Sequence, residues 1–192
     1  MHFKVRAAVK EDCKDISRMI MELAVYENMP DQVKTSHEDL ERDGFSPNPF
    51  YECLIAEVPD EHKTKDGYTV VGYALYFYTY STWKGRSVYV EDLYVMPDFR
   101  EKGIGTGLMA KVAQVGVEKQ CVRLQLSVLD WNKPSLDFYI AKGAEDLTAK
   151  EGLCWEDGWS IYMFGLPHIH GGSRDGGATH QRSQVMAHPP TP

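Results

Sequence analysis

Arg100-Glu101-Lys102-Gly103-Ile104-Gly105 stands between two runs of different character, the apolar run Val88 to Met96 and the amphipathic run Gly107 to Glu118. The first run is typical of a strand and the second of a helix, so the hexapeptide is a basic, glycine-rich turn. Gly103 and Gly105 let the backbone turn freely and approach a ligand closely. The free N–H groups and the positive end of the following helix then face an anion. This stretch therefore predicts a phosphate site.

The turn alone leaves the kind of phosphate open. The dinucleotide fingerprint G-x-G-x-x-G does not fit, because Gly103, Gly105 and Gly107 are spaced as G-x-G-x-G. A phosphate loop of the type G-x-x-x-x-G-K-[ST] does not occur in the sequence. On the hexapeptide alone, a tight strand-to-helix turn that carries a surface arginine is an equal alternative.

Composition narrows the class of protein. The chain has 192 residues, 43% of them hydrophobic, and a net charge of −7 from 21 basic and 28 acidic residues. We expect one globular domain over residues 1–167. The acidic balance disfavours nucleic acid as a partner and mildly suits a cationic small substrate. No apolar run reaches the membrane-spanning length of about 20 residues, and Met1 to Arg6 lacks a signal-peptide hydrophobic region, so we expect no membrane partner.

Cysteine and histidine usage points to a cytoplasmic protein without a metal. The four cysteines are widely separated and form no C-x-x-C, which favours reduced thiols over a zinc site. From His168 onward the chain is rich in Gly, Ser, His and Pro, and we predict a disordered tail over residues 168–192. His168 and His170 form an H-x-H within that tail, but no other cluster of ligands accompanies them, so we expect no metal site.

The periodicity of the remaining sequence predicts a mixed succession of strands and helices. Strands are expected over residues 3–7, 51–58, 70–80, 87–96, 122–129, 144–147 and 159–166. Helices are expected over 10–24, 36–43, 104–119 and 132–142, with Ser36 and Asn132 as N-caps. This order indicates an α+β fold with a mixed, mostly antiparallel sheet flanked by helices, and not a doubly wound fold.

Four separated stretches now carry a resemblance to a known family. They are FYECLIAEV (Phe50 to Val58), YSTWKGR (Tyr80 to Arg86), YVEDLYVMPDFREKGIG (Tyr89 to Gly105) and VLDWN (Val128 to Asn132). In this order they resemble the diamine acetyltransferases of the GNAT superfamily of N-acetyltransferases, most closely the thialysine-type members. The pyrophosphate motif of that superfamily is [QR]-x-x-G-x-[GA]. The resemblance covers Phe3 to Glu151.

The resemblance implies the GNAT fold, with splayed central strands that hold acetyl-CoA and no metal. The pyrophosphate would bind the turn, and the pantetheine arm would pair like an added strand with the backbone of Leu93 to Val95, opposite Val122 to Leu129. The residues implied in cofactor binding are Leu93, Tyr94, Val95, Arg100, Glu101, Lys102, Gly103, Ile104, Gly105, Thr106, Asn132, Lys133, Pro134 and Ser135.

The implied reaction is direct attack of a neutral amine on the thioester, which needs a base. Glu91 and Asp92 are the candidates. Because side chains alternate along a strand, we expect only one of the two carboxylates to face the site. The resemblance implies Glu91, acting through water. The alternative for Glu91 is an ordinary charge on the strand surface.

The leaving thiolate needs a proton, and Tyr139 matches the general acid of the family. A phenol with an ordinary pKa of about 10 is protonated at neutral pH and can donate a proton. The alternative is that Tyr139 is an aromatic residue of the core.

For the amine substrate, the resemblance implies Tyr26, Glu27, Ser81, Gln125, Leu126 and Ser127. Glu27 would face a second cationic group, or it is a solvated charge at a helix end. Trp83 either lines the pocket or fills a turn.

The resemblance therefore implies an acetyl-CoA-dependent N-acetyltransferase that acts on the primary amine of a small molecule, namely thialysine and related lysine analogues. Polyamines such as spermidine and spermine are the alternative substrates. A protein acetyltransferase, or a CoA-binding module that has lost efficient catalysis, is a further alternative. The presence of both Glu91 and Tyr139 opposes the loss of activity. The family is homodimeric, so the resemblance also implies a homodimer.

Overall fold

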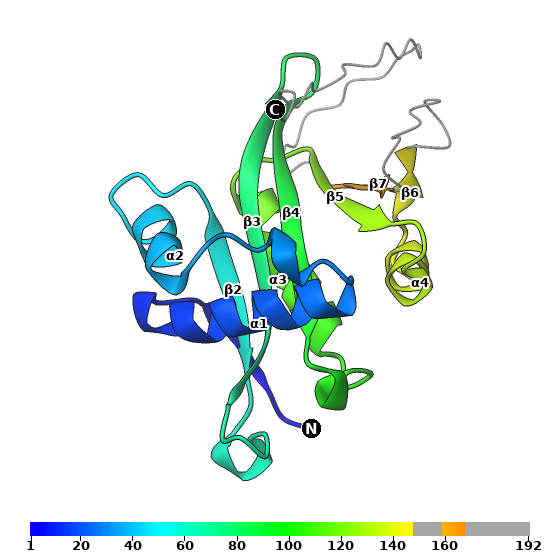
Figure 1. Ribbon diagram of the computed structural model, residues 1–192. Coiled ribbons are helices and arrows are strands. Elements are labelled where there is room, and N and C mark those ends of the chain that lie inside the picture. Colours follow the sequence, from blue (N-terminus) through cyan, green and yellow to red (C-terminus); the bar gives the residue numbers. More distant parts are fainter. Residues whose placement is uncertain (148–158, 168–192) are drawn as a thin grey trace.

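A seven-stranded sheet forms the centre of the computed structural model, which describes residues 1–147 and 159–167. The strand order is β1-β2-β3-β4-β5-β7-β6 (Figure 1). All neighbouring strands are antiparallel except β4 and β5, which are parallel. The predicted α+β fold with a mixed, mostly antiparallel sheet is confirmed. The tail predicted over 168–192, with its H-x-H, lies outside the described residues.

The elements follow the predicted order, with boundaries that differ by a few residues. The strands are β1 (Lys4–Ala7), β2 (Glu52–Glu57), β3 (Val70–Ser81), β4 (Gly85–Val95), β5 (Arg123–Leu129), β6 (Glu145–Asp146) and β7 (Trp159–Gly165). The α-helices are α1 (Cys13–Tyr26), α2 (His37–Gly44), α3 (Ile104–Glu118) and α4 (Lys133–Ala141). Short 3-10 turns lie at η1 (Lys10–Asp12), η2 (Pro30–Gln32), η3 (Asp60–His62) and η4 (Pro97–Phe99).

Two of the predicted helix starts have the expected chemistry. The Ser36 hydroxyl accepts a hydrogen bond from the backbone N–H of Asp39, and the Asp39 carboxylate accepts one from the N–H of Ser36. Asn132 accepts from the N–H of Ser135 in the same way. Each side chain satisfies a donor that the first turn of a helix leaves unpaired. These caps fix where α2 and α4 begin.

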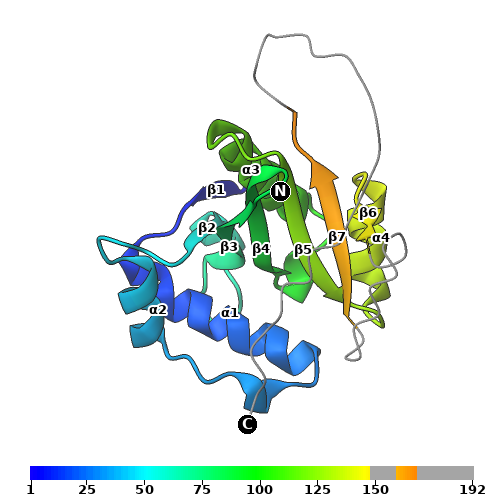
Figure 2. The same ribbon diagram turned by 90° about the horizontal axis from the view of Figure 1, so that it is seen from above.

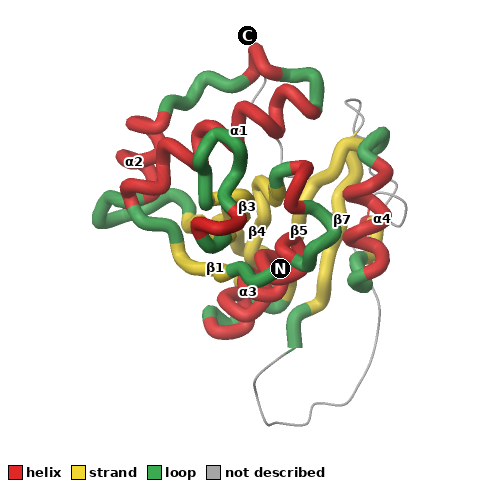
Figure 3. Tube along the Cα trace, turned by 90° about the horizontal axis from the view of Figure 1, so that it is seen from below, coloured by secondary structure: helices red, strands yellow, loops and turns green. Residues whose placement is uncertain are grey.

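The helices cover both faces of the sheet, and each face has its own core. Figures 2 and 3 show α1 and α2 on one face and α3 on the other. On the α1 side, Ile16 and Met19 pack with Ile55 and Tyr73; on the α3 side, a second cluster centres on residues such as Leu108. Burial on both faces explains why the middle strands read as nearly continuous apolar runs.

The two central strands separate along their length. Among the described residues, the parallel pairing joins only Ser87–Val90 of β4 with Arg123–Leu126 of β5. Beyond these residues β4 continues to Val95, whereas β5 pairs with β7 through to Leu129 (Figure 1). The predicted splay of the central strands is therefore present, and it opens the sheet on the side of the glycine-rich turn.

Candidate active site

A cavity of about 610 Å³ lies between the diverging ends of β4 and β5. It extends from the C-terminal end of α1 to the start of α3 and to α4. Most of the predicted site residues line it: Tyr26, Glu27, Glu91, Leu93, Tyr94, Val95, Arg100, Glu101, Gly103, Gly105, Thr106, Leu126, Ser127, Asn132, Pro134, Ser135 and Tyr139. The fold thus brings residues from both halves of the chain into one enclosure, in a size range suited to small-molecule ligands.

Three predicted cofactor residues have side chains outside the cavity lining. Ile104 is buried in the core, with 1% of its surface exposed. The ammonium of Lys102 donates to the carbonyl oxygen of Asp98, and that of Lys133 pairs with Asp137 at 2.8 Å. For Ile104 and Lys102, the backbone amides are the groups that a phosphate at the turn would use.

Two predicted substrate residues also lie outside the lining. Ser81 is at the end of β3, where its hydroxyl accepts from the backbone N–H groups of Trp83 and Lys84 at 3.3 and 3.1 Å. These bonds close the β3–β4 hairpin, of which Trp83 is part. Gln125 accepts a hydrogen bond from the buried Ser87 hydroxyl at 3.3 Å. The hydrogen bonds of Ser81 and Gln125 are typical of residues that stabilise the fold.

The glycine-rich turn has the geometry of an anion cradle. Gly103 is the N-cap of α3 and adopts a left-handed conformation with φ of 84°. Glycine occupies this region at no steric cost, whereas a Cβ makes it unfavourable. The next amides, at the first turn of α3, are donors that the helix itself cannot satisfy. The residues present therefore fit a pyrophosphate, with Arg100 beside it.

Arg100 connects the turn to the cavity wall. Its Nε donates to the carbonyl oxygen of Val95 at 2.8 Å. Its guanidinium carbon lies 5.3 Å from the ring centroid of Tyr26 and 5.7 Å from that of Tyr94. These contacts hold a positive charge at the end of β4, where the phosphates would lie.

Replacing both Arg100 and Gly103 by Ala is expected to weaken CoA binding by about tenfold or more, because a charge-assisted bond and the turn conformation are both lost. Isothermal titration calorimetry with CoA measures the change. Gly67→Ala is the matched control, because Gly67 has φ of 88° and does not line the cavity. Unaltered CoA affinity in the double variant would refute the phosphate role of the turn.

A β-bulge at Glu91 changes the expected arrangement of the two carboxylates. Leu75 of β3 pairs with Asp92 and Tyr76 pairs with Val90, so Glu91 is the extra residue of β4. The extra residue interrupts the alternation of side chains. The expectation that only one carboxylate faces the site was wrong, because both Glu91 and Asp92 line the cavity.

Asp92 and Glu27 form an acidic pair on the α1 side of the cavity. The Asp92 carboxylate accepts a hydrogen bond from the hydroxyl of the fully buried Tyr73 at 2.9 Å. Burial raises the pKa of Asp92, an effect that this hydrogen bond partly offsets. Burial, and then the charge of Asp92, raise the pKa of Glu27 to about 7. A cationic ligand between the two carboxylates would stabilise their charged forms.

The raised pKa of Glu27 predicts a pH-dependent stability. Between the ordinary value of 4.5 and about 7, the folded chain keeps a proton on Glu27 that the unfolded chain has released. The stability contributed by this group therefore falls as the pH rises through that window. For Glu27→Gln, the melting temperature relative to the unmodified chain should rise with pH across the window and then level off. Calorimetric melting at several pH values tests this, and a constant difference would contradict it.

Tyr139 lies in the second turn of α4 and faces the cavity with 7% of its surface exposed. Its ring makes an edge contact with that of Phe138 at 5.2 Å between centroids. Burial, and then the charges of Asp92 and Glu27, raise its pKa above the ordinary phenol value. Tyr139 therefore remains protonated at neutral pH and can donate a proton.

Several cavity residues were not predicted from the sequence. The hydroxyl of Tyr89 lies 2.7 Å from that of Ser127, across the parallel strand pair. The remaining lining residues are Leu23, Val90, Val128, Leu129, Phe138, Lys142 and Trp159. Asp92 was visible beside Glu91 as a carboxylate in an apolar run. For Tyr89 the sequence carries no signal, because a tyrosine in a strand is ordinary.

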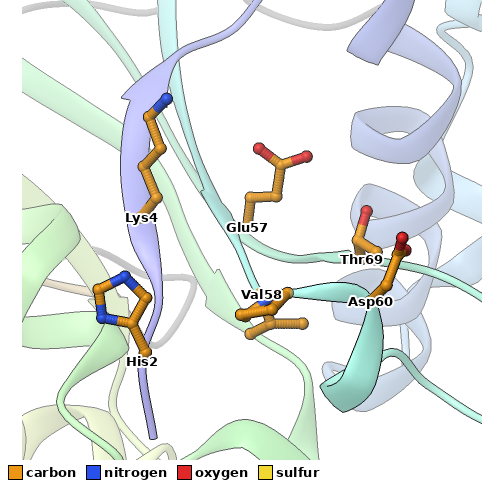
Figure 4. A pocket seen from close by; sticks show the side chains of 7 residues that line it. His2, Lys4, Glu57, Val58, Asp60 and Thr69 are labelled. Carbon is orange, nitrogen blue, oxygen red and sulfur yellow. The ribbon is translucent and has the colours of Figure 1, made fainter.

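A second hollow, of about 360 Å³, lies near β1 and η3. Figure 4 shows His2, which precedes β1, and Lys4 of β1 across from Glu57 and Val58, with Asp60 and Thr69 beside them. None of the residues predicted for the site lines it. Its lining mixes the basic Lys4 with the acidic Glu57 and Asp60, and it includes neither the glycine-rich turn nor Tyr139, so the larger cavity is the candidate active site.

The splayed parallel strands, the glycine-rich turn before α3 and the cavity between them are the arrangement expected of an acyltransferase of the GNAT type. Residues 19–143 match the acetyltransferase (GNAT) family, and the chain belongs to that family. It is an N-acetyltransferase.

Individual relatives agree with this assignment. The chain is 52% identical over 160 residues to thialysine N-epsilon-acetyltransferase of Bos taurus, covering 83% of this chain and 91% of the relative. It is 39% identical over 163 residues to the spermidine/spermine N(1)-acetyltransferase-like protein 1 of Homo sapiens, covering 85% of this chain and 22% of that protein. Among solved structures, the yncA acetyltransferase of Salmonella typhimurium with acetyl-CoA has a TM-score of 0.65 at 15% identity, covering 88% and 96% of the two chains.

Over residues 1–147 and 159–167, no group of three or more His, Cys, Asp and Glu side chains is arranged to hold a metal ion. In the same ranges, no helix has both the length and the apolar character needed to span a bilayer.

Proposed function

We propose that this N-acetyltransferase transfers the acetyl group of acetyl-CoA to the side-chain amine of thialysine and related lysine analogues. The observation that carries the proposal is the convergence of Glu91, Asp92 and Tyr139 on one cavity beside an anion-binding turn. The similarity to the thialysine acetyltransferases over most of both chains supports the choice of amine.

In the proposed mechanism, each residue has one task. Bound acetyl-CoA supplies the thioester, with its pyrophosphate on the amides from Glu101 to Thr106 and beside Arg100. Glu91 accepts a proton from the substrate ammonium through water, so that a neutral amine can attack the carbonyl carbon. Tyr139 donates its phenolic proton to the departing thiolate, and the resulting phenolate takes up the second proton that the amine nitrogen loses as the amide forms. The hydrogen bond from Tyr73 holds Asp92 in place beside the substrate.

Polyamines are the second candidate substrates. The two carboxylates of Glu27 and Asp92 suit a ligand with more than one cationic group, and a relative named for spermidine and spermine is 39% identical. Thialysine also carries more than one charged group, so the acidic pair alone does not separate the two classes. Their relative reactivity depends on differences of a few kcal/mol in transition-state binding.

The test of the substrate assignment is kinetic. Initial rates with acetyl-CoA and either thialysine or spermidine give kcat/KM for each amine. We expect thialysine to have the higher value. A preference of about a hundredfold or more for spermidine, equivalent to about 3 kcal/mol, would overturn the assignment to thialysine in favour of polyamines. A preference for a peptide lysine would instead indicate a protein acetyltransferase.

The resemblance supports further proposals about the setting of this enzyme. We propose one catalytic domain over residues 1–167 followed by a tail, a cytoplasmic location, and function without metal, nucleic acid or membrane. We also propose a homodimer, for which the exposed Tyr80 and Trp83 at the β3–β4 hairpin offer apolar surface. Light scattering at several protein concentrations tests the dimer, and a monomer at all of them would contradict it.

A further inference from the structure

Tyr26, the last residue of α1, contacts two other parts of the cavity rim. Its ring centroid lies 5.8 Å from that of Trp131, in the turn between β5 and α4, at an interplanar angle of 49°. Its hydroxyl donates to Oδ1 of Asn132 at 3.4 Å. On the side of the phosphate turn, the guanidinium of Arg100 lies 5.3 Å from the same ring. One side chain therefore connects three segments that are far apart in the sequence.

The position of Tyr26 relates it to both ligands of the proposed reaction. Arg100 and Asn132 line the part of the cavity assigned to acetyl-CoA, and Glu27 lines the part assigned to the amine. Tyr26 precedes Glu27 directly and itself lines the cavity. The Tyr26 ring therefore borders both the acetyl-CoA site and the amine site.

Trp131 contacts the Tyr26 ring from outside the cavity. It does not line the cavity, and 52% of its surface is exposed. Tyr26 is also exposed, with 38% of its surface accessible. An exposed aromatic side chain at a helix end samples several rotamers unless a neighbour restrains it. The tilted ring contact with Trp131 provides such a restraint.

We propose that Trp131 is a positioning residue that holds Tyr26 in place across the rim, so that the amine and acetyl-CoA sites are preorganised before either ligand binds. The proposal rests on the proposed function for the identity of the two ligands. Without Trp131, the first ligand to bind would have to order Tyr26, and the second would find it already ordered. Loss of Trp131 should therefore weaken the binding of each ligand alone and create positive coupling between them.

Steady-state kinetics and calorimetry on Trp131→Ala test the proposal. We expect KM for thialysine and for acetyl-CoA each to rise by about threefold to tenfold, the range for loss of an aromatic pair, with kcat within about twofold. In calorimetry, saturating CoA should increase the affinity for thialysine more in the variant than in the unmodified chain. Trp131→Phe, which restores a ring, should recover most of both effects. Ile140→Ala, an equally exposed apolar residue on α4, is the control and should change neither.

A double-mutant cycle with Tyr26→Ala keeps the test independent of a general loss of stability. If Trp131 acts through Tyr26, adding Trp131→Ala to Tyr26→Ala should change the two KM values by less than about twofold. Unchanged KM values in Trp131→Ala, a fall in kcat alone, or additive effects in the cycle would overturn the proposal. If the unmodified chain does not acetylate thialysine, the proposed function is wrong. The CoA affinities of the same variants would still test whether Trp131 holds Tyr26 in place.

Discussion

Replacing Tyr139 by Phe is expected to lower kcat by about a hundredfold to a thousandfold, while the affinity for acetyl-CoA changes little. The phenol is buried, faces the cavity and is protonated at neutral pH, as an ordinary phenol is; burial raises its pKa further. Phe retains the ring and its packing on Phe138 but has no proton to give to the leaving thiolate. The measurement is kcat at saturating substrates, together with CoA affinity by calorimetry.

Tyr76→Phe is the matched control for this variant. Tyr76 is also a buried tyrosine, and its hydroxyl donates to Glu52 at 3.0 Å, away from the cavity lining. Its replacement removes a phenolic hydroxyl without removing the proposed acid, so kcat should remain close to that of the unmodified chain. An unchanged kcat in Tyr139→Phe would exclude Tyr139 as the general acid.

Replacing Glu91 by Gln is the second change with a large expected effect, a fall in kcat of about a hundredfold near neutral pH. The variant removes the proposed base, so only the small neutral fraction of the amine can react. Because that fraction grows with pH, the deficit should shrink as the pH rises. The pH profile of kcat/KM measures both effects.

Asp92→Asn separates the two neighbouring carboxylates. Asp92 is held by Tyr73 and lies close enough to Glu27 to raise its pKa, which suits a role in binding the cationic end of the substrate. We therefore expect Asp92→Asn mainly to raise KM for the amine, with a smaller effect on kcat. The reverse pattern, with kcat lost in Asp92→Asn and retained in Glu91→Gln, would make Asp92 the base.

Local patterns were enough to predict most of the fold. The alternation and apolar runs of β2 to β5, the cap at Ser36 and the glycine-rich turn at Gly103 each depend on neighbouring residues. Such features follow from backbone preferences within a few positions, which a sequence displays directly. The splay of β4 and β5 was expected only from the family resemblance, because no local signal marks where two parallel strands stop pairing.

The sequence allowed most of the residues that line the site to be predicted, but not how those residues contact one another. The bulge at Glu91 depends on how β3 and β4 pair, and it brings Asp92 into the cavity against the rule of alternation. The contact between Tyr26 and Trp131 joins residues on opposite sides of the sheet opening, and no periodicity relates them. Ser81 matches the family position, but its hydroxyl closes a hairpin in this structure.

A structure of the complex with CoA and thialysine would show whether Tyr139 is placed to protonate the leaving thiolate, through the distance between the Tyr139 hydroxyl oxygen and the CoA sulfur. The proposed mechanism places the pyrophosphate on the amides from Glu101 to Thr106, the pantetheine arm between β4 and β5, and the sulfur within hydrogen-bonding reach of Tyr139, about 3 to 4 Å. A sulfur well beyond that reach, or CoA bound outside the opening between the two strands, would contradict it.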